Sequence, residues 1–292
     1  MGRRVVPDER MSEHDDPSDR PAIWEFDVAD PMRRNQVVGR AAVLGAAVGV
    51  LAVGLAARGR RVSAAGVVAG AAALGAAAFV PSAPLFGPTL SRGPAAGSQA
   101  ALTFDDGPGP STDALLDVLA DEGVHATFFV LGRQARAYPQ LIARMQRDGH
   151  QIASHGYDHG ILVFRGPRYV DRQLRATEAA VVAAAGQGAL TPYFRAPHGF
   201  RGPATWLSAR RRGYHMAAWT TGVWDTAEPG VEVIVARSAE ALVPGAVILL
   251  HDADGWDATR TRPQTVDAIP GICAAARDLG LALVRFDELV GV

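Results

Sequence analysis

Side chains that can bind a metal or move protons recur along the C-terminal two-thirds of the chain. Two adjacent acids come first, then two histidines, an arginine, a further acid and a histidine–acid pair: Asp105, Asp106, His155, His159, Arg195, Asp225, His251 and Asp252. Two imidazoles and one carboxylate can hold a divalent metal and leave positions open for water and substrate. We therefore predict that Asp106, His155 and His159 bind a metal.

The histidine pair alone is a weak indication, because two surface histidines often stand four residues apart by chance. The Asp-Asp-Gly-Pro turn at 105–108 favours the metal hypothesis, since it would follow another strand. Gly156, next to the first histidine, is compatible with a loop as well as with a helix.

The remaining polar residues match the needs of amide or ester hydrolysis. This reaction requires a nucleophilic water, a base, an acid and oxyanion stabilisation, and a bound metal lowers the pKa of water to about 7. Asp105 suits the base, with Arg195 keeping it ionised, although an Arg–Asp pair is also compatible with a structural role. His251 suits the acid, and either Asp225 or Asp252 can be the carboxylate that keeps it protonated.

Short apolar runs that alternate with amphipathic stretches must position these residues. The expected strands lie near 101–104, 127–130, 151–154, 193–195, 215–219, 247–250 and 281–284. Helices are indicated after Ser111, Pro139 and Pro203. We predict an α/β fold for 99–292, a distorted (β/α) barrel of about seven strands, with its polar residues gathered at the carboxyl ends of the strands.

These residues resemble the polysaccharide deacetylases of the NodB-homology type, also called carbohydrate esterase family four. The stretch 103–108, Thr-Phe-Asp-Asp-Gly-Pro, reproduces the first motif of that family, and His155 and His159 match its metal histidines. The stretch 195–199 is similar to the third motif, and 249–251 to the last. The resemblance extends from Gln99 to the C-terminus in the order of the family.

The resemblance implies a metal-dependent hydrolase that removes N-acetyl or O-acetyl groups from a carbohydrate polymer such as peptidoglycan, chitin oligomers or acetylated xylan. Zinc is the expected ion, with cobalt, manganese and nickel as alternatives. The implied roles are listed together: Asp105 as base, His251 as acid, Arg195 and Asp225 as their partners, Asp106, His155 and His159 as metal ligands, and Pro197, His198, Trp224 and Leu249 as substrate-binding residues.

Several positions depart from the family pattern. Gly156 stands in place of a Ser or Thr, and His198 in place of a frequent Tyr whose backbone N–H would bind the oxyanion. In the fourth motif, Gly222 replaces an acid and Thr226 replaces a Trp that walls the acetyl pocket, for which Trp224 is the expected substitute.

The N-terminal third has a different composition. We expect a disordered polar tail at 1–36, two Ala/Gly-rich transmembrane helices within 37–80 and an extended linker at 81–98. Ala-rich composition alone, or a signal segment that is cleaved to release the domain, would also explain the apolar stretches. Arginines flank both stretches, so the orientation is open, and we expect a membrane-anchored, extracytoplasmic catalytic domain.

Composition limits the kinds of partner and the role of the cysteine. The net charge of -1 gives no reason to expect a nucleic-acid partner, and Cys273, the one cysteine, suits a buried core thiol. Two other functions fit the same residues: a non-catalytic glycan-binding domain, and an amidase or deformylase acting on a small or lipid-linked substrate. The sequence does not indicate an oligomeric state.

Overall fold

The computed structural model describes residues 78, 81 and 87–291. The strands in this part are β1 (Thr89–Leu90), β2 (Gln99–Asp105), β3 (Thr127–Val130), β4 (Gln151–Ser154), β5 (Leu190–Phe194), β6 (His215–Ala217), β7 (Thr221–Gly222), β8 (Val247–His251) and β9 (Ala282–Leu283). The helices are α3 (Thr112–Asp121), α4 (Gly132–Ala137), α5 (Pro139–Arg147), α6 (Pro167–Ala185), α7 (Pro203–Arg211), α8 (Val231–Ala241), α9 (Pro263–Asp278) and α10 (Phe286–Val290), with 3₁₀ turns η3 (Pro197–Gly199) and η4 (Asp225–Ala227).

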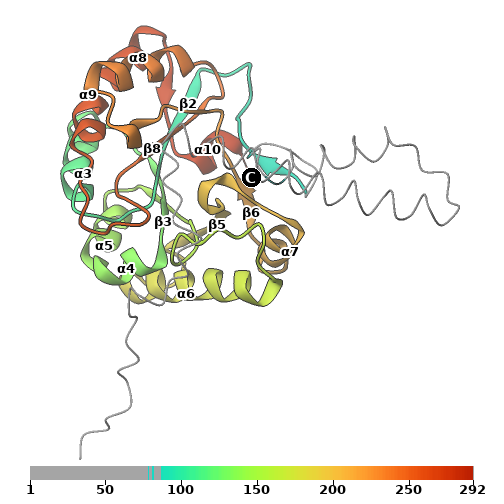
Figure 1. Ribbon diagram of the computed structural model, residues 1–292. Coiled ribbons are helices and arrows are strands. Elements are labelled where there is room, and N and C mark those ends of the chain that lie inside the picture. The colour runs from blue at the N-terminus through green and yellow to red at the C-terminus, as the bar shows by residue number, and fades with distance from the viewer. Residues whose placement is uncertain (1–77, 79–80, 82–86, 292) are drawn as a thin grey trace, which may run out of the picture.

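The strands form one curled parallel sheet with helices on its outside (Figure 1). Its order is β1-β6-β5-β4-β3-β2-β8-β7, with β9 paired to β2, and every pairing is parallel. In the described part of the chain the edge strands β1 and β7 each pair with a single neighbour, so the sheet is an open half-barrel. All strands therefore direct their carboxyl ends toward the same rim.

The prediction of about seven strands was too low, because the sheet has nine strands within residues 87–291. The two additional strands, β1 and β7, contain two residues each, too few to show an alternating pattern. The seven predicted strands are all present. β3 and β4 have the expected bounds, whereas β6 ends at Ala217 instead of 219.

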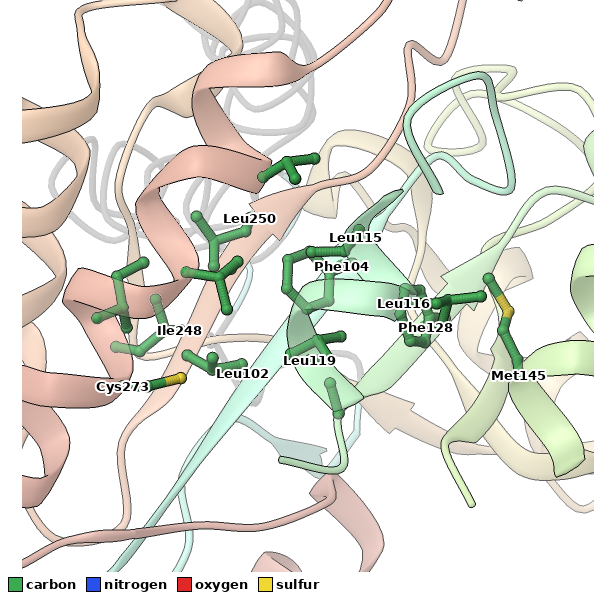
Figure 2. Close-up of a cluster of buried hydrophobic side chains, with 14 of the residues drawn as sticks. Leu102, Phe104, Leu115, Leu116, Leu119, Phe128, Met145, Ile248, Leu250 and Cys273 are labelled. Atoms are coloured by element: carbon green, nitrogen blue, oxygen red, sulfur yellow. The ribbon is translucent and has the colours of Figure 1, made fainter. Parts of the chain in front are cut away.

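Residues of even number in the central strands face the helices. Leu102 and Phe104 of β2, Phe128 of β3, and Ile248 and Leu250 of β8 lie in the main hydrophobic core. They pack against α3, α5 and α9, whose side chains include Leu115, Leu116, Leu119, Met145 and Cys273 (Figure 2). Cys273 is buried there, which confirms its predicted place.

Residues of odd number face the inside of the half-barrel, because successive side chains of a strand point to opposite faces. Phe129, Tyr193 and Val247 form a second cluster with Phe286 and Leu289 of α10. This cluster of apolar side chains fills part of the interior of the half-barrel. The same alternation directs the polar residues at the strand ends toward the inside at the rim.

The predicted helix starts at Pro139 and Pro203 are confirmed. Ser111 holds the N-cap position of α3, but its hydroxyl makes no capping bond and instead accepts a hydrogen bond from the backbone N–H of Arg262, at 2.7 Å. The start of α3 is thereby tied to the loop that follows β8.

The predicted polar tail and transmembrane helices lie outside the described residues, apart from Ala78. Within the part that the structure describes, no helix is long and apolar enough to cross a membrane. The expected linker at 81–98 is corrected in its described portion. Thr89–Leu90 pairs with β6, and the N–H of Gly93 donates to the carbonyl of Gly245 at 2.9 Å. These residues are part of the sheet.

Candidate active site

Three side chains from two loops converge at the rim. Asp106 follows β2, while His155 and His159 lie in the loop after β4. The Nε2 atoms of His155 and His159 lie 3.4 and 3.1 Å from Oδ1 of Asp106. One ligand atom from each residue lies within 4.8 Å of the other two, and all three residues are buried. The structure thus brings the three predicted metal ligands together.

The chemistry of these groups fits a divalent cation. Burial raises the pKa of Asp106 to about 7 and lowers that of His155 to about 4, so the imidazole is neutral. His155 Nδ1 donates to the carbonyl of Arg195 at 2.9 Å, which leaves the Nε2 lone pair facing Asp106. Oδ1 of Asp106 has no hydrogen-bond donor among the described residues. A cation would satisfy this buried oxygen and both imidazoles.

The predicted base is held by Arg195, which follows β5 and is completely buried. Its Nη1 lies 2.6 Å from Oδ1 of Asp105 and donates to Thr103 Oγ1 at 2.9 Å. Burial lowers the pKa of Arg195, while the negative charge of Asp105 acts in the opposite direction, and a guanidinium remains protonated. The other carboxylate oxygen, Oδ2, lies 3.6 Å from Nε2 of His155. Asp105 is therefore beside the metal site and paired to a permanent cation.

The predicted acid, His251, is the last residue of β8 and is paired with Asp225. Its Nδ1 lies 2.9 Å from Asp225 Oδ1, and its backbone N–H donates to Oδ2 at 2.8 Å. Thr265 Oγ1 donates to the same Oδ2 at 2.9 Å. Of the two candidate carboxylates, the structure selects Asp225, because Asp252 instead accepts from the hydroxyl of Thr112 at 2.6 Å.

Opposing effects set the protonation of this pair. Burial acts to lower the pKa of His251, but the charge and hydrogen bond of Asp225, with the charges of Asp106 and Asp105, outweigh it and raise the pKa to about 9. For Asp225, burial acts to raise the pKa, but the charge and hydrogen bonds of His251 and the Thr265 hydroxyl lower it. An imidazolium next to a carboxylate is the expected state at neutral pH.

Asp252 braces the loop that carries the first motif. Its Oδ2 accepts from Thr112 Oγ1, which in turn accepts from the backbone N–H of Gly109 at 2.7 Å. A Cβ at Gly107 would lie 1.9 Å from the same carboxylate oxygen, so only glycine allows this approach. The backbone N–H of Asp252 also donates to the carbonyl of Asp105, at 3.4 Å. Thus Asp252 positions the loop and is not the partner of the acid.

The substrate-binding residues that the resemblance implies lie at different depths. Pro197 is buried, and Leu249 is nearly buried in β8, on the same face of the strand as His251. His198 lies in η3 with its ring centroid 4.3 Å from that of His159. Trp224, the expected substitute in the acetyl pocket, has 46% of its surface exposed.

A further aromatic residue, which sequence reasoning missed, lies against the metal ligands. The ring of Trp256 is 5.1 Å from that of His159 and stacks at 5.8 Å on that of His198. It belongs to the loop after β8. An aromatic residue shortly after the strand that carries the predicted acid was the signal that could have identified it.

The backbone around the site is strained. Five described residues other than glycine have positive φ, and four of them lie at or next to the site: Asp106 (77°), His159 (62°), His198 (58°) and Trp224 (61°). Such conformations cost of order 1–3 kcal/mol each and persist where the surrounding contacts determine them. Their concentration at one rim agrees with a functional site.

Known proteins similar to this chain were found by sequence and by structure. Residues 92–217 match a family model described as polysaccharide deacetylase. A chitooligosaccharide deacetylase of Sinorhizobium fredii is 36% identical over 188 residues, covering 62% of this chain and 87% of that protein. A peptidoglycan-N-acetylglucosamine deacetylase of Bacillus cereus is 31% identical over 196 residues, covering 65% and 87%. The solved Bc1960 peptidoglycan N-acetylglucosamine deacetylase superposes with a TM-score of 0.64 at 27% identity, covering 69% of this chain and 92% of that one.

Proposed function

The chain belongs to the polysaccharide deacetylase family, and from this premise we propose that it removes N-acetyl groups from a polymer of N-acetylglucosamine in the cell envelope, with metal assistance. As a member of this family it is a carbohydrate deacetylase, a hydrolase. O-acetyl groups are the alternative target, because the same groups serve ester and amide hydrolysis.

One observation carries the proposal: the loop that bears Asp106 begins where a base candidate, Asp105, and an acid candidate, His251, lie side by side on β2 and β8, each with its own partner. Asp105 is paired with a buried arginine at 2.6 Å, and His251 with a buried carboxylate at 2.9 Å. A domain that only binds a glycan needs neither pair. A carboxylate and an imidazole, each with a partner of opposite charge beside a candidate metal site, are what general base and general acid catalysis require.

Asp106, His155 and His159 would hold the ion, which when bound supplies a Lewis acid that polarises the acyl carbonyl and makes water a better nucleophile. Asp105 takes the proton of the attacking water, because the hydrogen bond from Arg195 orients its carboxylate. His251 donates a proton to the departing sugar nitrogen, since Asp225 keeps the imidazole protonated. The backbone N–H of His198 is the candidate donor to the oxyanion.

The substrate part of the proposal draws on the relatives. The Sinorhizobium protein is named for chitooligosaccharides and the Bacillus protein for peptidoglycan, and both names describe glycans that contain acetylated glucosamine. We propose zinc as the ion, with cobalt, manganese or nickel as alternatives. Membrane anchorage with an extracytoplasmic domain is also a proposal, supported by the apolar stretches within 37–80.

The test is acetate release by the purified full chain from chitooligosaccharides and from peptidoglycan, with added zinc or cobalt and with chelator. We expect acetate that disappears with chelator and returns with metal, and Asp105→Asn is the matched inactive control. A folded protein that binds metal but releases no acetate from any glycan would favour the small-amide or deformylase reaction. A folded protein that binds no metal would favour the glycan-binding function.

A further inference from the structure

Trp256 is held against the metal site by a braced loop. The loop leaves β8 at His251, and the indole packs edge-on to His159, with ring centroids 5.1 Å apart. The same indole stacks on His198 at an interplanar angle of 20°. Trp256 itself keeps part of its surface exposed. The indole thus contacts both site histidines, while the residue is not fully buried.

Buried charges keep this loop in place. Oδ1 of Asp254 accepts hydrogen bonds from the backbone N–H groups of Trp256 and Asp257, at 2.8 and 3.0 Å. The nearly buried Arg262 donates to Oδ2 of Asp254 at 2.8 Å and to the carbonyl of Ala253 at 3.0 Å. Such bracing lowers the entropy that a ligand must remove when it binds the indole.

A second tie comes from α4. Arg133 donates to the carbonyl of Gly255, at 2.5 Å, immediately before Trp256. Two arginines therefore hold the loop: Arg262 at its end and Arg133 from α4. This bracing holds the indole in one position at the rim, as a preformed binding surface requires.

His198 adds a polar atom to the same surface. Its ring centroid lies 4.3 Å from that of His159. Its Nε2 is buried and has no hydrogen-bond partner among the described residues. Nε2 is therefore a buried polar atom that a hydrogen bond to a ligand hydroxyl would satisfy.

We propose that Trp256 and His198 form a sugar subsite on the His159 side of the metal ligands, where the indole stacks on the apolar face of a pyranose ring and His198 Nε2 accepts a hydrogen bond from a sugar hydroxyl. This inference rests on the proposed function and names the element that holds the glycan. Aromatic side chains present an apolar face that suits the C–H face of a sugar, and the hydroxyl supplies direction. Trp224, which is exposed and precedes Asp225 in the chain, is not part of this subsite.

The test measures binding and turnover separately in the full chain loaded with zinc. Chitotetraose is the probe. Binding is measured by calorimetry in an Asp105→Asn background, which prevents turnover, and steady-state kinetics is measured in the chain that keeps Asp105. Trp256→Ala is expected to raise Kd and KM at least about tenfold with kcat within about threefold, because stacking is lost before the chemical step. Trp256→Phe is expected to recover most of this loss.

His198→Phe keeps a ring in the stack but removes the acceptor, so we expect KM to rise about threefold to tenfold, the effect of one hydrogen bond. Leu279→Ala is the matched control, since Leu279 is an exposed residue after α9. Zinc affinity is measured for every variant and is expected to stay at the wild-type value.

The proposal is overturned if Trp256→Ala leaves Kd and KM within twofold, or if its effect is a loss of zinc, because the indole would then only support His159. The subsite and the proposed function fail separately. Binding that depends on Trp256 without acetate release keeps the subsite and rejects the deacetylase activity. Acetate release with unchanged Kd and KM in Trp256→Ala rejects the subsite and keeps the activity.

Discussion

Arg195 connects the candidate base with the candidate metal site. Its guanidinium pairs with Asp105, while its backbone carbonyl accepts the Nδ1–H of His155. The guanidinium also lies 3.9 Å from the ring centroid of Phe129, which accounts for its complete burial. A change at this residue would therefore disturb both the base and one metal ligand, so it cannot separate their roles.

The base and the ligands can be separated by substitution at Asp105 and His159. Asp105→Asn keeps the shape of the side chain and does not touch the ligand set, so we expect wild-type metal content with turnover reduced about 10²–10⁴-fold. His159→Ala removes a ligand and should lose both metal and activity. Metal content is measured by elemental analysis and turnover by acetate release. Retention of metal by His159→Ala would contradict the ligand assignment.

The pair of His251 and Asp225 predicts the alkaline limb of the pH profile. Since the acid acts in its protonated form, activity should persist up to a pH of about 9 and fall above it. Asp225→Asn removes the charge that raises the pKa of His251, so the alkaline limb of kcat/KM should move to lower pH by more than about one unit. Thr265→Val, which removes one hydrogen bond to Asp225, should move it less.

The same pair affects stability with a known sign. The folded pKa of His251 lies above the ordinary value of 6.5, so the pair stabilises the fold fully below pH 6.5 and this contribution is lost as the pH rises through about 9.

For the activity profile, an alkaline limb of kcat/KM in Asp225→Asn equal to that of the wild type would show that another group is the acid.

At the scale of elements, the loop after β8 packs closely against the loop after β4. Gly255 in the first of these loops must therefore lack a side chain. A Cβ at Gly255 would lie 2.1 Å from Nδ1 of His159. Real Cβ contacts are never this short, so a larger residue must displace the histidine ring or the loop.

Gly255→Ala should therefore weaken metal binding by at least about tenfold, because it displaces a ligand from its position. Gly166→Ala is the matched control, since a Cβ at that N-cap of α6 meets nothing within 4 Å. Zinc affinity by competition with a chromogenic chelator is the measurement. Equal zinc affinities of the two variants would mean that the two loops accommodate the added Cβ without displacing His159.

At the scale of the whole molecule, the sheet includes β1, which precedes the first sequence motif in the chain. The N–H of Ala218 donates to the carbonyl of Leu90 at 2.8 Å, that of Gly93 donates to Gly245 at 2.9 Å, and Thr220 Oγ1 donates to Ser91 at 3.0 Å. Leu90 also packs against the cluster inside the half-barrel. This segment therefore covers one edge of the sheet next to β6.

A chain that starts at Gln99 should be less stable than one that starts at Gly87. It lacks at least four hydrogen bonds, because the N–H of Ala282 also donates to the carbonyl of Ser98. Each is worth about 0.5–1.5 kcal/mol, so we expect a free energy of unfolding lower by about 2–6 kcal/mol. Urea unfolding of the two proteins gives this difference. If the two proteins have the same midpoint and slope, β1 contributes nothing to the fold.

The sequence alone determined the central strands and the polar residues at or after their carboxyl ends. Alternating apolar residues predicted the central strands, and the motif around Asp105 and Asp106, with the histidines that follow, identified the three candidate metal ligands that converge. These predictions succeeded because side-chain period and residue type are local properties of the chain. The carboxyl ends of parallel strands then necessarily share one rim.

Only the tertiary structure decided which hydrogen-bond partner or packing neighbour each site residue has. It selected Asp225 over Asp252 for His251, assigned Asp252 to the bracing of the first motif, and placed Trp256 beside His159. These contacts join residues that are tens to more than one hundred positions apart, and their geometry depends on loop conformations with positive φ and on close glycine contacts. No local pattern encodes such conformations, because the packing of distant elements imposes them.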